Sequence, residues 1–414
     1  MKDSIIKKVL NEYETPFYLY DQQILMQSVN KLYDLLDNHV TLLYSVKANP
    51  LLYICQLMKQ SGCGLEVSSQ GEIYLALKTG IDKSLIFYSG PGKNSSDIQY
   101  AIEKKVGIIS VESDDELALI NTIASNKNII QPVLIRINPN YKSKDLRISM
   151  TGISSQFGID EEVLDETYID KISLLKNIQV VGIHVYFGTQ NLDVNSIIQN
   201  TDYIFRLAIR LEQKYCVECK YINLGGGFGV DYFSNETSLD MIEFKKMFLE
   251  LLKKYNIYLQ NKNLIMESGR FLTANAGMFI TKVLYIKESR GKTFVICDGG
   301  SNFHASSAFL GRFVRKNFPM RVLEKTQSKT KLCTIVGPLC TPTDIIGQDY
   351  NLPIDISKGD YIIIEKSGAY GLTNSPLNFL SFNTPSELLV TENNELKCMR
   401  LRGKPEDILR NQID

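Results

Sequence analysis

The chain has 414 residues, a length that suggests about two domains. Its 46 basic and 46 acidic residues balance, so no net positive charge favours nucleic-acid binding. No apolar run is long enough for a transmembrane helix, and the N-terminus lacks a signal-peptide core. The cysteines are scattered, and Cys216 and Cys219 form a lone CxxC without a second ligand pair. We therefore expect a cytoplasmic protein with neither a disulfide framework nor a metal site, which binds no nucleic acid and no membrane.

A helix at the N-terminus and a strand over residues 16–21 precede a regular alternation of apolar strands and amphipathic helices. Eight strands are predicted at 42–47, 64–69, 85–90, 108–112, 133–138, 180–188, 221–227 and 264–270. Helices are predicted between them, among others at 71–79, 95–104, 114–124, 195–214 and 242–255. This pattern predicts a (β/α)8 barrel, with an open doubly wound sheet as the alternative.

After residue 271 the pattern changes to short alternating runs separated by turn residues, without long helical segments. Strands are predicted at 278–286, 293–297, 332–336, 360–365, 386–390 and 396–401. We therefore predict an α/β barrel over residues 22–270 and an all-β domain formed by residues 1–21 and 271–414, with the strand at 17–20 pairing into it.

The ends of the predicted barrel strands are unusually rich in polar and glycine residues. Active-site residues of such barrels lie at the carboxyl ends of the strands. The residues at these ends are Lys47, Ser68, Ser89, Gly90, Glu112, Arg136, Asn138, His184, Gly225, Gly226, Gly227, Glu267 and Arg270. A plain structural core does not need this series, so it predicts a functional site.

Lys47 ends the first of these strands, and Ala48-Asn49-Pro50 then breaks the extended conformation. A lysine that is half buried loses hydration of its ammonium group, so its pKa falls and its amine becomes nucleophilic. That is the requirement for a lysine that forms a Schiff base. The structural alternative is a lysine whose ammonium group reaches out to water.

Two further motifs suggest the partner of such an amine. The consecutive glycines Gly225–Gly227 let backbone N–H groups converge on a phosphate. The motif Glu267-Ser268-Gly269-Arg270 supplies a carboxylate, which can keep a pyridine nitrogen protonated, and a guanidinium group, which can clamp a phosphate. His184 could stack on a flat ring, although a lone histidine is more often a satisfied core residue.

Six motifs occur in the order YSVKANP, HVYFGTQ, LGGGFG, ESGR, GPLCTPTD and SGAYG. Together they resemble the fold-type III pyridoxal-phosphate decarboxylases, the ornithine and diaminopimelate decarboxylase family. The resemblance implies that Lys47 binds the cofactor covalently, His184 stacks on its ring and Glu267 pairs with its ring nitrogen. It also implies that Gly225–Gly227, Arg270 and Tyr370 hold the phosphate. We add Ser68, Arg136 and Gly269 to the predicted cofactor-binding residues.

In that family the cysteine that matches Cys340 comes from the other subunit and returns a proton to the substrate. The resemblance therefore implies a homodimer with shared active sites, in which the β-domain contributes to the interface and to the site. The predicted catalytic residues are Lys47, His184, Glu267 and Cys340.

The substrate is indicated by a departure from the family pattern. In ornithine and diaminopimelate decarboxylases an acidic residue follows the cysteine and meets the distal ammonium of the substrate, whereas this chain has Thr341 and Pro342. A buried ammonium group without a partner costs several kcal/mol. Several segments are similar to a subgroup, known from butirosin biosynthesis, that decarboxylates glutamyl groups carried on an acyl-carrier protein. We predict that Thr341, Asp344 and Tyr370 contact the substrate.

A carrier protein is acidic, and the basic residues of the segment 312–316, with Arg321, could form its docking patch. The main alternative is a decarboxylase of a free amino acid. A racemase of the same fold would place an arginine, not Glu267, against the ring nitrogen. An inactive relative that binds a regulatory partner would be expected to lack Lys47 or Cys340, and both are present.

Overall fold

The computed structural model describes residues 1–36, 40–141, 148–149, 151–215, 217–233, 236–308, 316–326 and 328–413. The chain divides into two compact units. One contains residues 29–231 and 237–271, and the other contains residues 1–28, 232–236 and 272–414. Among the described residues, no helix has both the length and the apolar character needed to cross a membrane.

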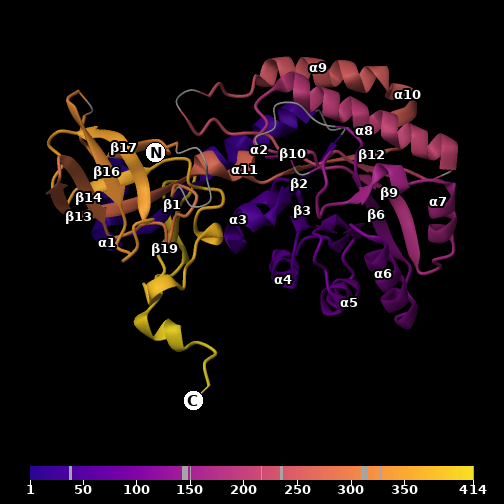
Figure 1. Cartoon of the computed structure of the whole chain (residues 1–414), viewed down its shortest axis with the longest axis horizontal. Coiled ribbons are helices and arrows are strands. Elements are labelled where there is room, and N and C mark those ends of the chain that lie inside the picture. Colours follow the sequence, from indigo (N-terminus) through magenta and orange to yellow (C-terminus); the bar gives the residue numbers. More distant parts are fainter. Residues whose placement is uncertain are drawn as a thin grey trace. The chain divides into compact units, whose positions relative to one another are not determined.

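The first unit is a closed parallel barrel (Figure 1). Its strands run in the order β5-β4-β3-β2-β12-β11-β9-β6, and pairing of β5 with β6 closes the ring. The strands of this part of the chain are β2 (Val40–Ser45), β3 (Gly64–Val67), β4 (Ile86–Tyr88), β5 (Ile108–Val111), β6 (Gln131–Asn138), β9 (Ile178–His184), β11 (Tyr221–Asn223) and β12 (Asn263–Ser268). All eight strands were predicted from the sequence, and the open-sheet alternative is wrong.

The interior of the barrel is filled by large apolar side chains that point inward from most of the strands. One buried cluster consists of Leu43, Phe87, Ile108, Leu134, Val181 and Ile265. Six of the eight strands contribute to this packed core, and the polar residues predicted for the site lie at the strand ends.

Helices alternate with the barrel strands and surround them (Figure 1). Local sequence signals start several of them: Asn94 and Asp97 form a capping box, and the side chain of Ser113 accepts a hydrogen bond from the backbone of Glu116. The helices are α2 (Gln22–Leu36), α3 (Leu52–Gln60), α4 (Gln70–Lys78), α5 (Ser95–Lys104), α6 (Asp114–Asn126), α7 (Glu166–Ser173), α8 (Val194–Tyr215), α9 (Met241–Lys254), α10 (Asn256–Leu259) and α11 (Arg270–Thr273). Short strands β7 (Ile148–Ser149), β8 (Ile159–Asp160) and β10 (Gly188–Thr189) lie outside the ring.

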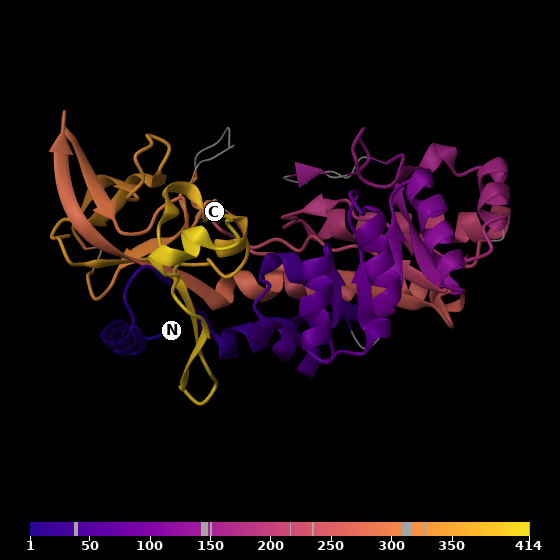
Figure 2. The ribbon, with the colours of Figure 1, turned by 90° about the horizontal axis from the view of Figure 1, so that it is seen from below.

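The second unit is built on a mixed sheet in the order β17-β16-β14-β13-β1-β19-β20, with β18 pairing to β13 and β15. Ile6 and Val9 of helix α1 (Asp3–Glu12) pack into its core, and Figure 2 shows this indigo helix beside the orange strands. The strands are β1 (Phe17–Asp21), β13 (Gly277–Ser289), β14 (Lys292–Cys297), β15 (Met320–Val322), β16 (Thr330–Val336), β17 (Ile345–Pro353), β18 (Tyr361–Ile364), β19 (Ser386–Val390) and β20 (Leu396–Arg400).

The prediction that the N-terminal strand joins this sheet is confirmed, since β1 pairs with β13 and β19. The six strands predicted after residue 271 are also present. Strands β15 and β17 were not predicted. β15 has only three residues, and β17 carries the turn-forming residues Gly347, Asp349 and Asn351, which mask its strand pattern.

Gly182 provides a test of the barrel packing. It lies opposite Tyr221 in the β9–β11 pair, and a Cβ atom built on it would stand 1.8 Å from the carbonyl oxygen of Tyr221. We expect Gly182→Ala to force the two strands apart and to lower the free energy of unfolding by about 3 kcal/mol, measured by denaturant titration.

Gly71→Ala is the matched control. Its Cβ would meet only the hydroxyl oxygen of Ser69, at 3.7 Å, and it lies in helix α4, where alanine is the better helix former. An equal loss of stability in both variants would contradict the proposed clash.

Candidate active site

Lys47 lies in the single 3-10 turn Val46–Ala48 that follows β2, so the strand ends two residues earlier than the sequence suggested. Its Nζ atom is 2.8 and 2.7 Å from the two carboxylate oxygens of Glu66 on the neighbouring strand β3. The lysine side chain is 42% exposed and that of Glu66 is 1% exposed. The amine of Lys47 is therefore accessible at the end of the barrel, while its ion-pair partner Glu66 is buried.

Glu66 was missed by the sequence analysis. Burial raises the pKa of its carboxyl group, but the ammonium group of Lys47 and hydrogen bonds from the hydroxyl groups of Ser89 and Ser45 bring that pKa below its usual value. The hydroxyl of Ser68 also lies 3.3 Å from this carboxylate. A signal was available, because Glu66 is a charged residue inside the otherwise apolar strand β3.

Glu267 lies near the end of β12, which pairs with β2, so Glu267 and Lys47 come from neighbouring strands. Its Oε1 atom accepts a hydrogen bond of 2.8 Å from Asn223, and the side chain is buried. Burial and the negative charge of Glu66 raise the pKa of Glu267 to about 7, against the opposing effects of Lys47, Asn223 and Arg136. This acid can therefore hold or release a proton near neutral pH.

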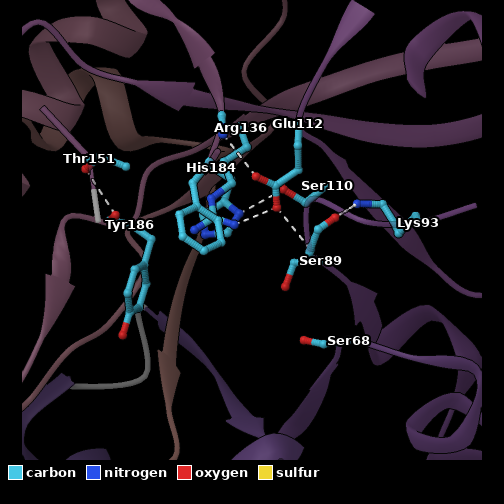
Figure 3. A network of polar contacts seen from close by, with 12 residues as sticks. Ser68, Ser89, Lys93, Ser110, Glu112, Arg136, Thr151, His184 and Tyr186 are labelled. Carbon is cyan, nitrogen blue, oxygen red and sulfur yellow. Dashed lines mark hydrogen bonds and ion pairs between the residues drawn. The ribbon is translucent and has the colours of Figure 1, made fainter. Parts of the chain in front are cut away.

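His184 ends β9 with its ring buried (Figure 3). Its Nδ1 atom shares a hydrogen bond of 2.8 Å with the hydroxyl of Ser110. Its Nε2 atom is 3.5 Å from Oε1 of Glu267 and, among the described residues, has no hydrogen-bond partner. Burial, together with the positive charges of Arg136, Lys47 and Lys93, holds the pKa of His184 well below its usual value, so the ring is neutral.

The predicted phosphate loop follows β11, and its backbone packs against the neighbouring chain. Gly225 and Gly227 have φ angles of +66° and +104°, which favour glycine. A Cβ atom on Gly226 would lie 1.9 Å from the carbonyl oxygen of Glu267, and one on Gly227 would lie 2.2 Å from that of Gly188. No other residue type fits this cradle without moving the backbone.

The remaining predicted barrel residues lie at the same end of the strands. Ser68 is exposed, and a Cβ atom on Gly269 would lie 2.8 Å from Cβ of Ala48, in the turn that carries Lys47. Arg270 begins α11. Arg136 lies two residues before the end of β6, opposite His184 in the β6–β9 register, and its Nη1 atom is 2.6 Å from Oε1 of Glu112. The barrel thus brings together all the site residues predicted within it.

The other predicted residues belong to the β unit. Cys340 is exposed in the loop between β16 and β17, and the adjacent Thr341 contacts the hydroxyl of Thr343 at 3.0 Å. Tyr370 has a φ angle of +54°, and its carbonyl oxygen accepts a hydrogen bond of 2.5 Å from Ser306. The roles of Cys340, Thr341 and Tyr370 in substrate and cofactor binding remain predictions.

Asp344 is buried and already engaged. Its carboxylate accepts hydrogen bonds from the backbone N–H groups of Ser301, at 2.7 Å, and Leu339, at 2.9 Å. Contact of this carboxylate with a substrate, as expected from the sequence, would require these bonds to open. Cys216 of the CxxC pair and residues 312–315 of the basic segment lie outside the described residues.

The barrel mouth therefore combines a primary amine, a neutral imidazole, a glycine cradle and an acid that titrates near pH 7. This combination defines an enzyme built to bind an aldehyde cofactor with a phosphate group and a basic ring nitrogen. Residues 23–274 match the family model for the pyridoxal-binding domain of pyridoxal-dependent decarboxylases.

Similarity to individual proteins extends over the whole chain. The chain is 38% identical to the L-glutamyl-[BtrI acyl-carrier protein] decarboxylase of Niallia circulans, over 99% of this chain and 96% of that protein. It is 31% identical to a diaminopimelate decarboxylase of Helicobacter pylori, over 99% and 98% of the two chains. The crystal structure of diaminopimelate decarboxylase from Helicobacter pylori with L-lysine matches with a TM-score of 0.86, covering 98% of each chain at 31% identity.

The chain belongs to the pyridoxal-dependent decarboxylases. Its cofactor is pyridoxal 5'-phosphate, and the residues present fit that group. Lys47 offers an amine for the aldehyde, the glycine cradle offers backbone for the phosphate, and Glu267 offers an acid for the ring nitrogen. The buried Nε atom of Arg136 and Nε2 atom of His184, neither with a hydrogen-bond partner among the described residues, also mark this end of the barrel as polar.

The raised pKa of Glu267 predicts a pH effect on the stability of the cofactor-free protein. The folded state binds this proton more tightly than the unfolded chain, so its contribution to stability is present at low pH and is lost as the pH rises through about 7. Glu267→Gln removes the titration. We expect the stability of the wild type, relative to this variant, to fall by roughly 2 kcal/mol between about pH 5 and pH 8, measured by denaturant titration. A constant difference would contradict the raised pKa.

Proposed function

We propose that this enzyme removes the α-carboxylate from a glutamyl group that is bound through its side chain to an acyl-carrier protein. The observation that carries the proposal is the similarity over 99% of the chain to a relative named for this reaction. The product would be a γ-aminobutyryl thioester that stays on the carrier.

The chemistry of the β16–β17 loop supports this choice of substrate. Thr341 follows Cys340, where the resemblance to ornithine and diaminopimelate decarboxylases leads us to expect an acid. The nearby Asp344 is bound to two backbone N–H groups and is only 2% exposed, so it is poorly placed to pair with an ammonium group. A substrate attached through its distal carbonyl group brings no distal ammonium into the site, so binding of this substrate does not require an acid at position 341.

We assign the reacting groups as follows. Lys47 would hold the cofactor through its amine and would yield that position to the α-amine of the substrate. The chemistry that bound pyridoxal phosphate would supply is a sink for the electrons released by decarboxylation. Glu267 would hold a proton toward the ring nitrogen, and the neutral imidazole of His184 would stack on the ring. Gly225–Gly227, Arg270 and Tyr370 hold the phosphate. Cys340 returns a proton to the α-carbon.

We also propose a cytoplasmic homodimer in which Cys340 of one subunit serves the site that contains Lys47 of the other. The exposure of Cys340 supports this arrangement, because a proton donor to a second subunit must be reachable. The cytoplasm suits the seven cysteines of the described residues, all of which are free thiols.

For docking of the carrier protein, Arg321 is a weak candidate, since it already forms ion pairs with Asp3 and Glu365.

The substrate is tested by measuring carbon dioxide release from three compounds: a glutamyl thioester on an acyl-carrier protein, free glutamate and diaminopimelate. We expect kcat/KM for the thioester to exceed the values for both free amino acids by about 100-fold or more. Thr341 offers no acid for the distal ammonium of diaminopimelate, and free glutamate would bring an additional charge that the thioester lacks. Faster turnover of diaminopimelate would instead favour a decarboxylase of free amino acids, the function named for several relatives at about the same 31% identity.

The shared site is tested by mixing two inactive variants, Lys47→Ala and Cys340→Ala, under conditions that let subunits exchange. Random pairing yields hybrid dimers with one intact site, so we expect recovery of about a quarter of the wild-type activity. Mixing Lys47→Ala with Lys47→Met is the matched control and should recover nothing. Absence of recovery, with hybrid dimers detected by mass spectrometry, would show that the two residues act within one subunit.

A further inference from the structure

A chain of four buried charges runs along the barrel mouth, next to the site but largely outside it (Figure 3). The Nζ atom of Lys93 is 2.7 Å from Oε1 of Glu116, and Nη1 of Arg136 is 2.6 Å from Oε1 of Glu112. The four side chains are between 1% and 7% exposed. The two positive and two negative charges balance, so the group as a whole is neutral.

The two ion pairs are joined through the backbone. Oε2 of Glu116 accepts a hydrogen bond of 2.9 Å from the backbone N–H of Glu112. Lys93 also donates to the carbonyl oxygen of Gly90, while the N–H of Gly90 donates to Oε1 of Glu112 at 3.0 Å. Oε2 of Glu112 accepts from the N–H of Gly158 at 3.0 Å. Displacement of any one member would therefore move the carboxylate that holds Arg136.

Stability alone does not account for this arrangement. A buried ion pair costs several kcal/mol of desolvation per ion, and apolar side chains of similar volume often serve equally well or better. The last member of this series of charges, Arg136, has a defined position in the site. The guanidinium of Arg136 lies 4.9 Å from the ring centre of Phe157, and Arg136 lies opposite His184 in the β6–β9 register.

We propose that Lys93, Glu116 and Glu112 are positioning residues for the decarboxylation, which hold Arg136 as a fixed cation beside His184 at the mouth of the barrel. None of the three needs to touch the substrate or the cofactor. They act mainly through Arg136, whose charge disfavours protonation of the imidazole and so keeps the ring neutral. The charge of Lys93 adds a smaller direct effect in the same direction.

Other groups also face His184, and the proposal accounts for them. Ser110 bonds to Nδ1, Glu267 lies 3.5 Å from Nε2, and Lys47 and Lys93 contribute further positive charges. Glu267 opposes the effect of the cations when it is ionised. Arg136 is the largest charge effect on His184 after burial itself, so its displacement should be the most visible.

The test replaces the remote ion pair with apolar side chains, in the variant Lys93→Met with Glu116→Leu. This change removes one positive and one negative charge, so the net charge is conserved. We expect the thermal unfolding midpoint to stay near that of the wild type. We expect pyridoxal phosphate to dissociate from the holoenzyme about tenfold faster, and kcat to fall by about 10- to 100-fold with less change in KM.

Histidine NMR supplies a readout that a purely structural ion pair would not move. The chain has only three histidines, and His184→Gln identifies the signal of His184. In the wild type this signal should stay constant across the neutral pH range, and in the double variant it should begin to titrate. Lys93→Met with Glu116→Gln keeps an acceptor for the N–H of Glu112, and it provides the same test if the leucine variant does not fold.

The matched control is the exposed pair Lys127–Glu103, whose 2.8 Å contact links residues at the opposite ends of the same helices, α5 and α6. Lys127→Met with Glu103→Leu should leave cofactor dissociation, kcat and the His184 signal unchanged. Wild-type cofactor retention and a constant His184 signal in the Lys93/Glu116 variant would overturn the proposal, as would equal effects in the control. Cofactor dissociation and NMR require no substrate, so failure of the glutamyl thioester proposal would leave this test intact.

Discussion

The ion pair between Lys47 and Glu66 governs the electrostatics of the barrel mouth. Glu66 is buried and ionised, and its charge is one reason why the neighbouring Glu267 retains its proton to higher pH. Lys47 acts in the opposite direction on Glu267 and also disfavours a charge on His184. One contact between adjacent strands therefore influences the protonation of both Glu267 and His184.

This balance has a chemical purpose. A pyridoxal enzyme that removes carbon dioxide needs an acid that shares a proton with the ring nitrogen and a ring partner that does not compete for that proton. In the proposed assignment, Glu267, with a pKa of about 7, is the acid, and the neutral His184 is the ring partner. The environment, rather than the residue types alone, separates their roles.

The barrel could be predicted from the sequence because each of its strands is a short apolar run that ends in polar or glycine residues. The same feature located Lys47, His184 and Glu267, since residues at the ends of parallel strands meet at one edge. Their partners were harder to find. Glu66 and Asn223 bond to residues on neighbouring strands, and no local pattern states which side chains will face each other.

The β unit shows a second limit of the sequence reasoning. Asp344 lies in a recognisable motif and is predicted to meet the substrate, but that motif does not reveal the hydrogen bond that its carboxylate accepts from the backbone of Ser301, a residue distant in the chain. The sequence of β17 resembles a loop because it contains turn-forming residues. The pairing of β17 with β16 accommodates these residues through shifts in register. In β17, pairing with the neighbouring strand overrides the local preference.

The position of β1 has a consequence for how the chain acquires its structure during synthesis. This strand leaves the ribosome early, yet its partners β13 and β19 begin only at Gly277 and Ser386. The complete barrel sequence is translated between them, so the barrel can fold as a nested module while β1 waits unpaired. The central part of this sheet can therefore form only after residues 386–390 have been made, so folding of the β unit must follow synthesis of the entire barrel.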